Sequence, residues 1–140
     1  MKVFFSYAQA DKKWAEGLRE KLREAWHGAD EELDIWNPAF KVAPGENWAL
    51  KYGRALENAD ALVILLSPNA VKSDWVKSEI DFALTRPHFR NKVIAVMARP
   101  TTDVPWILER FPVIKSSKDQ AKAARELASA LKKTRRREKR

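Results

Sequence analysis

The sequence has no cysteine, two histidines and four glycines, and each shortage excludes a class of chemistry. Without cysteine the chain can form no disulfide, no thiol nucleophile and no thiolate-bound metal. His27 and His88 are far apart in sequence, so we expect no metal site. The glycines are too scattered for a Gly-x-x-x-x-Gly-Lys or Gly-x-Gly-x-x-Gly phosphate-binding turn, and a Gly-x-Ser-x-Gly elbow is also missing from the sequence.

Long apolar runs are missing as well. The longest, Ala61 to Leu66, is far too short to cross a bilayer. The apolar start of the chain meets Ser6 and then charged residues too soon for a signal peptide. We therefore expect a cytoplasmic protein that makes no membrane contact. Its 140 residues, 45% hydrophobic and 33% charged, are typical of one globular domain with a buried core.

The net charge of +8 is concentrated at the C-terminal end of the chain. Residues 132–140 hold seven Lys or Arg and one Glu, which leaves 20 basic against 18 acidic residues in positions 1–131. We therefore expect a domain over residues 1–131 and a basic, disordered tail over 132–140. Such a tail can contact nucleic acid or an acidic partner, but a terminal run of like charges is more often a solvated end or a linker. Nucleic acid is thus an expected partner only through this tail.

Apolar segments alternate with helical patterns along the chain. The predicted strands are 2–7, 33–36, 61–66, 92–97 and 112–115. The predicted helices are 12–25 with Asp11 as its cap, 46–58, 74–86 and 118–132, with a short one near 104–110. Segment 61–66 is apolar without alternation, which indicates a strand buried on both faces. The pattern predicts a three-layer, flavodoxin-like α/β fold with a five-stranded parallel sheet of order 2-1-3-4-5. Ligands bind such sheets at the carboxyl ends of strands 1 and 3.

The helix that begins after Ser73 follows the most apolar strand, and Ser73 is a good cap for it. Winding this helix gives two stripes. The core stripe is predicted to hold Val76, Ile80, Ala83 and Leu84, and the stripe beside it holds Trp75, Glu79 and Phe82. Glu79 thus lies between aromatic neighbours at the edge of the buried face. Such a carboxylate is either a solvated surface residue paired with a base or part of a functional site.

Four short motifs occur in a fixed order along the chain. They are Val3-Phe4-Phe5-Ser6-Tyr7 with Asp11 after it, Pro44-Gly45-Glu46-Asn47-Trp48, Leu65-Leu66-Ser67-Pro68, and Ser73-x-Trp75-x-x-x-Glu79-Ile80. Taken together, this set resembles a Toll/interleukin-1 receptor (TIR) domain of the bacterial kind over nearly all of residues 1–131. Residues 37–48 correspond to the BB loop of that family.

The resemblance implies one of two functions. TIR domains either cleave NAD⁺ or associate with other TIR domains without catalysis. The first function implies an NAD⁺ glycohydrolase or cyclase that releases nicotinamide and forms ADP-ribose, a cyclic isomer or a base-exchange product. It would act in bacterial anti-phage signalling and be activated by self-association. NAD⁺ is then a substrate, and no cofactor is expected. Nicotinamide leaves as a neutral molecule and needs no acid, so one carboxylate can suffice.

Residue roles carry over from the family motif by motif. Glu79 matches the catalytic carboxylate. The expected substrate contacts are the apolar faces of Phe5, Tyr7, Trp48 and Trp75, the hydroxyls of Ser6 and Ser73, and Lys41 for phosphate. The rival function, TIR–TIR association, implies a docking loop that includes Phe40, Val42, Pro44 and Gly45. One departure concerns the end of strand 2, where many family members have an acidic residue and this chain has Asn37-Pro38.

Overall fold

The computed structural model describes residues 1–27, 31–37, 48–102, 104, 106–115 and 118–138. Its strands are β1 (Lys2–Ser6), β2 (Asp34–Trp36), β3 (Ala61–Leu66), β4 (Val93–Met97) and β5 (Val113–Ile114). They form one sheet in the order β2-β1-β3-β4-β5, and every neighbouring pair is parallel. The predicted strand order is confirmed.

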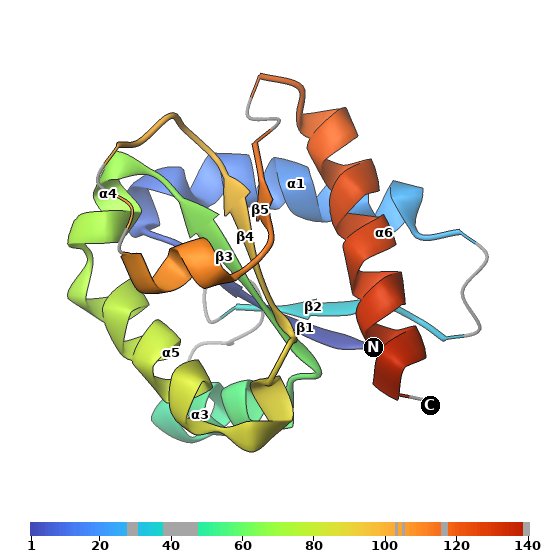
Figure 1. Ribbon diagram of the computed structural model, residues 1–140, viewed down its shortest axis with the longest axis horizontal. Coiled ribbons are helices and arrows are strands. Elements are labelled where there is room, and N and C mark those ends of the chain that lie inside the picture. The colour runs from blue at the N-terminus through green and yellow to red at the C-terminus, as the bar shows by residue number, and fades with distance from the viewer. Residues whose placement is uncertain (28–30, 38–47, 103, 105, 116–117, 139–140) are drawn as a thin grey trace.

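Helices cover both faces of this sheet (Figure 1). They are α1 (Lys12–Ala25), α3 (Trp48–Asn58), α4 (Pro68–Lys72), α5 (Asp74–Thr85) and α6 (Gln120–Glu138), with 3₁₀ turns η1 (Gln9–Asp11), η2 (Pro87–Phe89) and η3 (Trp106–Arg110). Helices α1 and α6 pack on one face, and α3 and α5 pack on the other. The protein therefore has the three expected layers. None of the described helices is long and apolar enough to span a membrane.

Strand β3 is buried along its whole length, as its unbroken apolar run predicts. Val63 and Leu65 join the core under α1 and α6, whereas Leu62 and Ile64 join the core under α3 and α5. The same period of two divides β1. Its odd residues Val3 and Phe5 face α1 and α6, and Phe4 faces α3 and α5. Because of this alternation, Phe4 can contribute to a site beside α5, whereas Val3 and Phe5 cannot.

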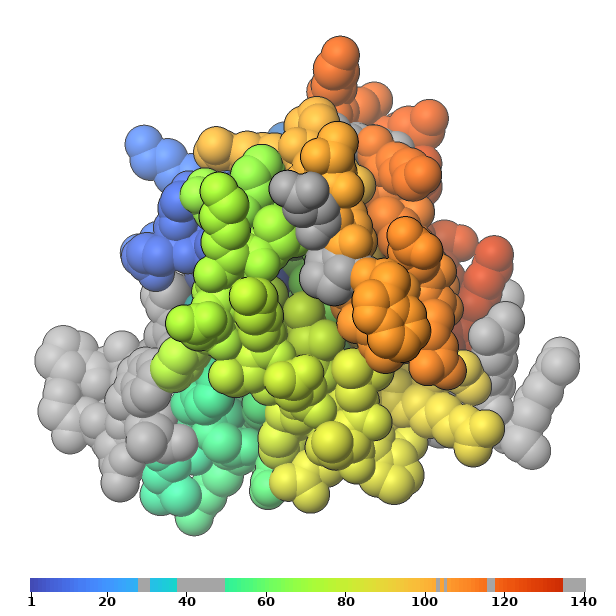
Figure 2. Space-filling view, turned by 60° about the vertical axis from the view of Figure 1, so that its left-hand side comes forward, coloured from blue at the N-terminus to red at the C-terminus, as the bar shows by residue number. Residues whose placement is uncertain are grey.

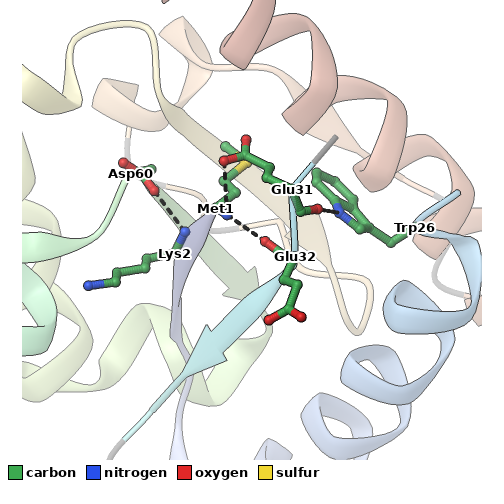
Figure 3. A network of polar contacts seen from close by, with 6 residues as sticks. All are labelled: Met1, Lys2, Trp26, Glu31, Glu32 and Asp60. Carbon is green, nitrogen blue, oxygen red and sulfur yellow. Dashed lines mark hydrogen bonds and ion pairs between the residues drawn. The ribbon is translucent and has the colours of Figure 1, made fainter. Parts of the chain in front are cut away.

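Polar contacts hold the first residues of β1 in place (Figure 3). The amino group of Met1 donates a hydrogen bond to the Glu32 carbonyl at 2.5 Å and lies 3.3 Å from the Glu31 carboxylate. The backbone N–H of Lys2 donates to Asp60 Oδ2 at 2.7 Å. These contacts join β1 to the segment before β2 and to the residue before β3, and so support the register of the three strands.

The structure differs from the sequence prediction at several places. Residues 68–72 form α4, which is not among the predicted helices, because the Ser67 hydroxyl accepts a hydrogen bond from the Ala70 N–H at 3.0 Å and Pro68 suits the first helical turn. Asp11 makes no side-chain cap bond to α1 and is buried instead. Leu84 is 42% exposed rather than in the core. On a helical wheel it lies about 80° from Val76, at the margin of the buried stripe.

Helix α6 continues to Glu138 and so includes most of the segment expected to be a disordered tail. Residues 132–138 contain no glycine or proline, and Lys and Arg are good helix formers. A helix therefore extends beyond the domain boundary predicted at residue 131.

Double burial of β3 predicts that leucines on its two faces matter equally. We expect Leu62→Ala and Leu65→Ala each to lower the free energy of unfolding by about 2–5 kcal/mol, because each leaves a cavity in a separate core. Urea denaturation would measure both losses. Leu84→Ala is the exposed control and should change stability by less than about 1 kcal/mol. A small effect at either β3 leucine would contradict the two-core arrangement.

Candidate active site

The candidate site lies at the carboxyl edge of the sheet, between β1 and β3. The direction of strand order reverses there, since β2 follows on one side of β1 while β3 and β4 follow on the other. Ser6 ends β1 and Ser67 follows β3, and both side chains are fully buried. Such switch points leave a crevice above the sheet where open α/β folds bind ligands.

Helix α5 begins at this edge and carries Glu79. The Ser73 hydroxyl accepts a hydrogen bond from the Val76 N–H at 3.2 Å, which confirms the predicted cap. Val76, Ile80 and Ala83 are buried against the sheet. With these residues directed inward, Glu79 lies about 60° to one side of Val76 on the helical wheel, at the flank of the buried stripe.

The Glu79 side chain is buried, with only 1% of the residue exposed. Neither of its carboxylate oxygens has a hydrogen-bond partner of normal geometry among the residues that the structure describes. The interpretation of Glu79 as a solvated surface residue is therefore wrong. A buried carboxylate without a partner is costly to ionise, so its environment resists the negative charge.

Burial raises the pKa of Glu79 from 4.5 to about 8, and the nearby hydroxyls of Ser6 and Tyr52 lower it only in part. Without a bound ligand the Glu79 carboxyl group is therefore mostly protonated at neutral pH. Burial also raises the pKa of Tyr52, and the charge of Glu79 adds to that rise. Burial, followed by the charge of Glu16, raises the pKa of Tyr7 to about 12.

Aromatic rings line the approach to Glu79. The Tyr52 ring lies 5.0 Å from Trp75 and 5.7 Å from Phe4, measured between ring centroids, and Trp36 lies 5.4 Å from Phe4. Trp75 is 45% exposed and forms the outer end of this row. The sequence places Tyr52 within the predicted helix 46–58, but its position beside Glu79 was not predicted. Phe4 was not predicted there either, although alternation along β1 places Phe4 on the same face as Ser6.

The predicted substrate contacts lie on different faces of the sheet. Ser6 and Trp75 lie on the side of Glu79, as expected. Phe5 does not, because its ring is 0% exposed and packs in the core under α1 and α6 on the other face. Tyr7 is buried in that same core, although the charge of Glu79 contributes to its raised pKa. The Ser73 hydroxyl is engaged as the helix cap.

The remaining predicted contacts cannot be placed. Lys41, Phe40, Val42, Pro44 and Gly45 lie outside the described residues, and so does the side chain of Trp48, the first residue of α3. Within the part of the chain that is described, no group of three His, Asp or Glu side chains could hold a metal ion.

An ionic contact between buried Asp11 and exposed Arg99 lies at the same edge of the sheet. Asp11 accepts a hydrogen bond from the Ser67 hydroxyl, and its other carboxylate oxygen is 3.5 Å from the Arg99 guanidinium. The contact joins the ends of β1, β3 and β4 at the carboxyl edge. Asn37 supports the same edge, because its side-chain amide donates to the Phe5 carbonyl at 2.7 Å. Asn37 thus has a structural contact at the position where many family members have an acid.

A parallel sheet of order 2-1-3-4-5, with a buried carboxyl group beside its switch point, defines a flavodoxin-like α/β domain. The family model described as the TIR domain matches residues 3–131. The chain therefore belongs to the TIR domain family, a family of signalling and association domains.

Relatives of known identity agree with this assignment. Toll-like receptor 2 of Boselaphus tragocamelus is 31% identical over 123 residues, which is 78% of this chain and 14% of the receptor. Human Toll-like receptor 2 is 34% identical over 96 residues, which is 63% of this chain and 10% of the receptor. The chain thus spans about a seventh or less of the length of these receptors.

Solved structures with low sequence identity share the fold. The TIR domain of the Toll-related receptor TRR-2 from Hydra magnipapillata superposes with a TM-score of 0.70 at 20% identity, covering 94% of this chain and 98% of that domain. A prokaryotic SEFIR domain superposes with a TM-score of 0.65 at 14% identity, and the match covers 92% of this chain and 90% of that domain.

The raised pKa of Glu79 predicts a specific dependence of stability on pH. Between pH 4.5 and 8 the folded state holds a proton that the unfolded state has lost, so this group lowers the free energy of unfolding by about 1.4 kcal/mol for each unit that pH rises. Glu79→Gln removes the effect. We therefore expect the stability of this variant relative to wild type to rise by about 2–3 kcal/mol from pH 5.5 to 7.5, measured by urea denaturation.

Asp81→Asn is the matched control, because Asp81 is an exposed acid on the same helix. Its stability relative to wild type should stay nearly constant across this range. A constant difference for Glu79→Gln as well would show that Glu79 has an ordinary pKa.

Proposed function

We propose that this TIR domain cleaves the bond between nicotinamide and ribose in NAD⁺, with Glu79 as the catalytic carboxylate. The observation that carries the proposal is the buried Glu79 carboxyl group, which lies near the hydroxyls of Ser6 and Tyr52 and forms no ion pair with a described residue. Buried carboxylates are normally paired, and an unpaired one in a crevice is a candidate functional group.

A cationic substrate would supply the missing partner. The nicotinamide ring of NAD⁺ is positively charged, so a ring bound beside Glu79 favours the ionised carboxylate and lowers its pKa. As the bond breaks, its electron pair stays on the nicotinamide nitrogen, and positive charge moves to the ribose. Glu79 then stabilises the oxocarbenium character of the sugar. Addition of water and loss of its proton give ADP-ribose, and addition of a group of the same molecule gives a cyclic isomer.

The aromatic row gives this reaction a binding surface. Trp75 is exposed enough to contact a planar ring, and Tyr52 lies between Trp75 and the buried Phe4. The Tyr52 hydroxyl is close enough to Glu79 for the two groups to shift each other's pKa. We assign Trp75 to contact with the substrate and Tyr52 to positioning of the carboxylate. We assign the buried Ser6 hydroxyl, which lies near Glu79 and lowers its pKa, to contact with the ribose.

Association without catalysis is the second candidate function. The similarity to Toll-like receptor 2 favours it, at 31–34% identity over the matched segments. The predicted docking loop with Phe40, Val42, Pro44 and Gly45 would bind another TIR domain. The two functions are compatible if association completes the active site. In that case the protein would act in bacterial immune signalling in the cytoplasm and be switched on by self-association.

Loss of the Glu79 carboxylate is the direct test of catalysis. We expect concentrated wild-type protein to consume NAD⁺ and release nicotinamide. Glu79→Gln and Glu79→Ala should lower the rate at least about 100-fold, because the developing positive charge loses its counter-charge. Chromatography with mass detection would follow NAD⁺ and identify the ribose product.

Asp81→Asn should keep a rate within about twofold of wild type, since its exposed carboxylate is on the same helix but outside the crevice. Equal rates in the Glu79 variants would contradict the assignment. If wild-type protein crosslinked into assemblies fails to cleave NAD⁺, the association function is favoured instead.

The pH profile tests the same carboxylate independently. Because free Glu79 must ionise, we expect kcat/KM to rise about tenfold per pH unit below pH 8 and to level off above it. The kcat profile should level off at a lower pH, because the bound cation lowers the pKa of Glu79. Initial rates at subsaturating and saturating NAD⁺ would separate the two profiles. A kcat/KM that is flat from pH 5 to 9 would exclude an essential group with this pKa.

A further inference from the structure

A cavity lies at the amino edge of the sheet, at the opposite end of the strands from the candidate site. It has a volume of about 610 Å³ and lies between the end of α5 with η2 on one side and the end of η3 with the start of β5 on the other. In Figure 2 the yellow surface that follows α5 adjoins the orange surface of η3 on the face shown. Strands β4 and β5 begin at this edge. The volume is within the range of sites that bind small molecules.

The cavity has an apolar base and a basic rim. Phe89 and Val93 are buried below it, Phe111 is half-buried, and Leu84 is exposed at its side. Three arginines line it, and none of the described lining residues is acidic. We call it the arginine cavity, after Arg86, Arg90 and Arg110.

The three arginines are not equivalent. The Arg86 guanidinium lies 4.4 Å from the centre of the Phe82 ring and 4.0 Å from the Glu57 carboxylate, so it already has two partners. Arg90 and Arg110 form no ion pair with any residue that the structure describes. Arg90 follows η2 and Arg110 ends η3, and both side chains are exposed at the rim of the cavity. Two guanidiniums without an ion pair beside one cavity raise the local positive potential and favour an anion there.

We infer that the arginine cavity binds a small ligand that carries a phosphate monoester and an apolar or planar group, such as a nucleoside monophosphate. Arg90 and Arg110 hold the phosphate from its two sides, since guanidinium groups match phosphate oxygens in geometry and charge. The planar group lies against Leu84 and Phe111. A phosphate monoester has close to two negative charges at neutral pH, which matches two guanidiniums. The inference does not depend on NAD⁺ cleavage, because no residue of the crevice takes part.

Calorimetric titration with adenosine monophosphate in low salt tests the inference. We expect binding to wild-type protein, at least tenfold weaker binding to Arg90→Gln/Arg110→Gln, and unchanged binding to Arg125→Gln, an exposed arginine on α6. Adenosine should not bind measurably, and Glu79→Gln should bind the nucleotide like wild type. The same pattern should persist whether or not the protein cleaves NAD⁺.

A titration of wild-type protein followed by NMR of the arginine Nε–H groups checks the result without a substitution. The signals of Arg90 and Arg110 should shift with the nucleotide, and that of Arg125 should not. No binding to wild type at millimolar nucleotide, binding that the double variant retains, or binding that only Glu79→Gln removes would overturn the inference. Dimerisation that the double variant suppresses, without nucleotide binding, would also overturn it and would assign the cavity to an acidic surface of a second copy.

Discussion

Burial of β1 and β3 on both faces is the constraint on which the rest of the structure depends. A central parallel strand sends alternate side chains into two separate cores, so each residue of β1 belongs to one face or the other. Phe5 thereby fills the core under α1 and α6, and Phe4 and Ser6 face the side of α5. The strand order reverses between β1 and β3, and ligands of such folds bind above this point, on the side that Phe4 and Ser6 face. Glu79 lies on this side because the stripe of α5 beside it is held against the same sheet.

The cost of burying Glu79 links this architecture to the proposed reaction. Stability alone gives no reason to place an unpaired carboxyl group here, because a polar group without a partner destabilises the fold. A site that is uncharged when empty and ionised beside a cationic ring couples binding to proton release. In the proposed reaction, the bound substrate would create the charge that bond cleavage needs. The arginine cavity lies at the other edge of the sheet and is lined by positive charge, whereas Glu79 becomes negative only when it ionises. The arginine cavity therefore suits an anionic ligand, and the Glu79 site suits a cationic one.

The strand order and most helix boundaries follow from the sequence, because apolar runs, caps and the right-handed crossover rule leave few arrangements. Glu79 and Trp75 were predicted on the correct helix for the same reason. Three features of the site could not be predicted from the sequence and are shown only by the structure. The faces of Phe4 and Phe5 depend on the phase of β1, which two adjacent phenylalanines do not reveal. The pairing of Asp11 with Ser67 and Arg99 joins residues far apart in sequence. Tyr52 approaches Glu79 only because α3 and α5 share one face. The predicted contacts of Lys41 and of residues 40–45 stay predictions.

The ionisation of Glu79 in the ligand-free protein is the most direct test of the account. A ¹³C NMR titration of the Glu79 side-chain carboxyl carbon, assigned by comparison with Glu79→Gln, would measure its pKa. We expect a midpoint near 8, which moves to lower pH when a non-cleavable NAD⁺ analogue binds beside Glu79. A midpoint near 4.5 that the analogue does not change would show that the carboxylate is solvated or already paired. The buried, unpaired carboxyl group at the centre of this account would then be absent.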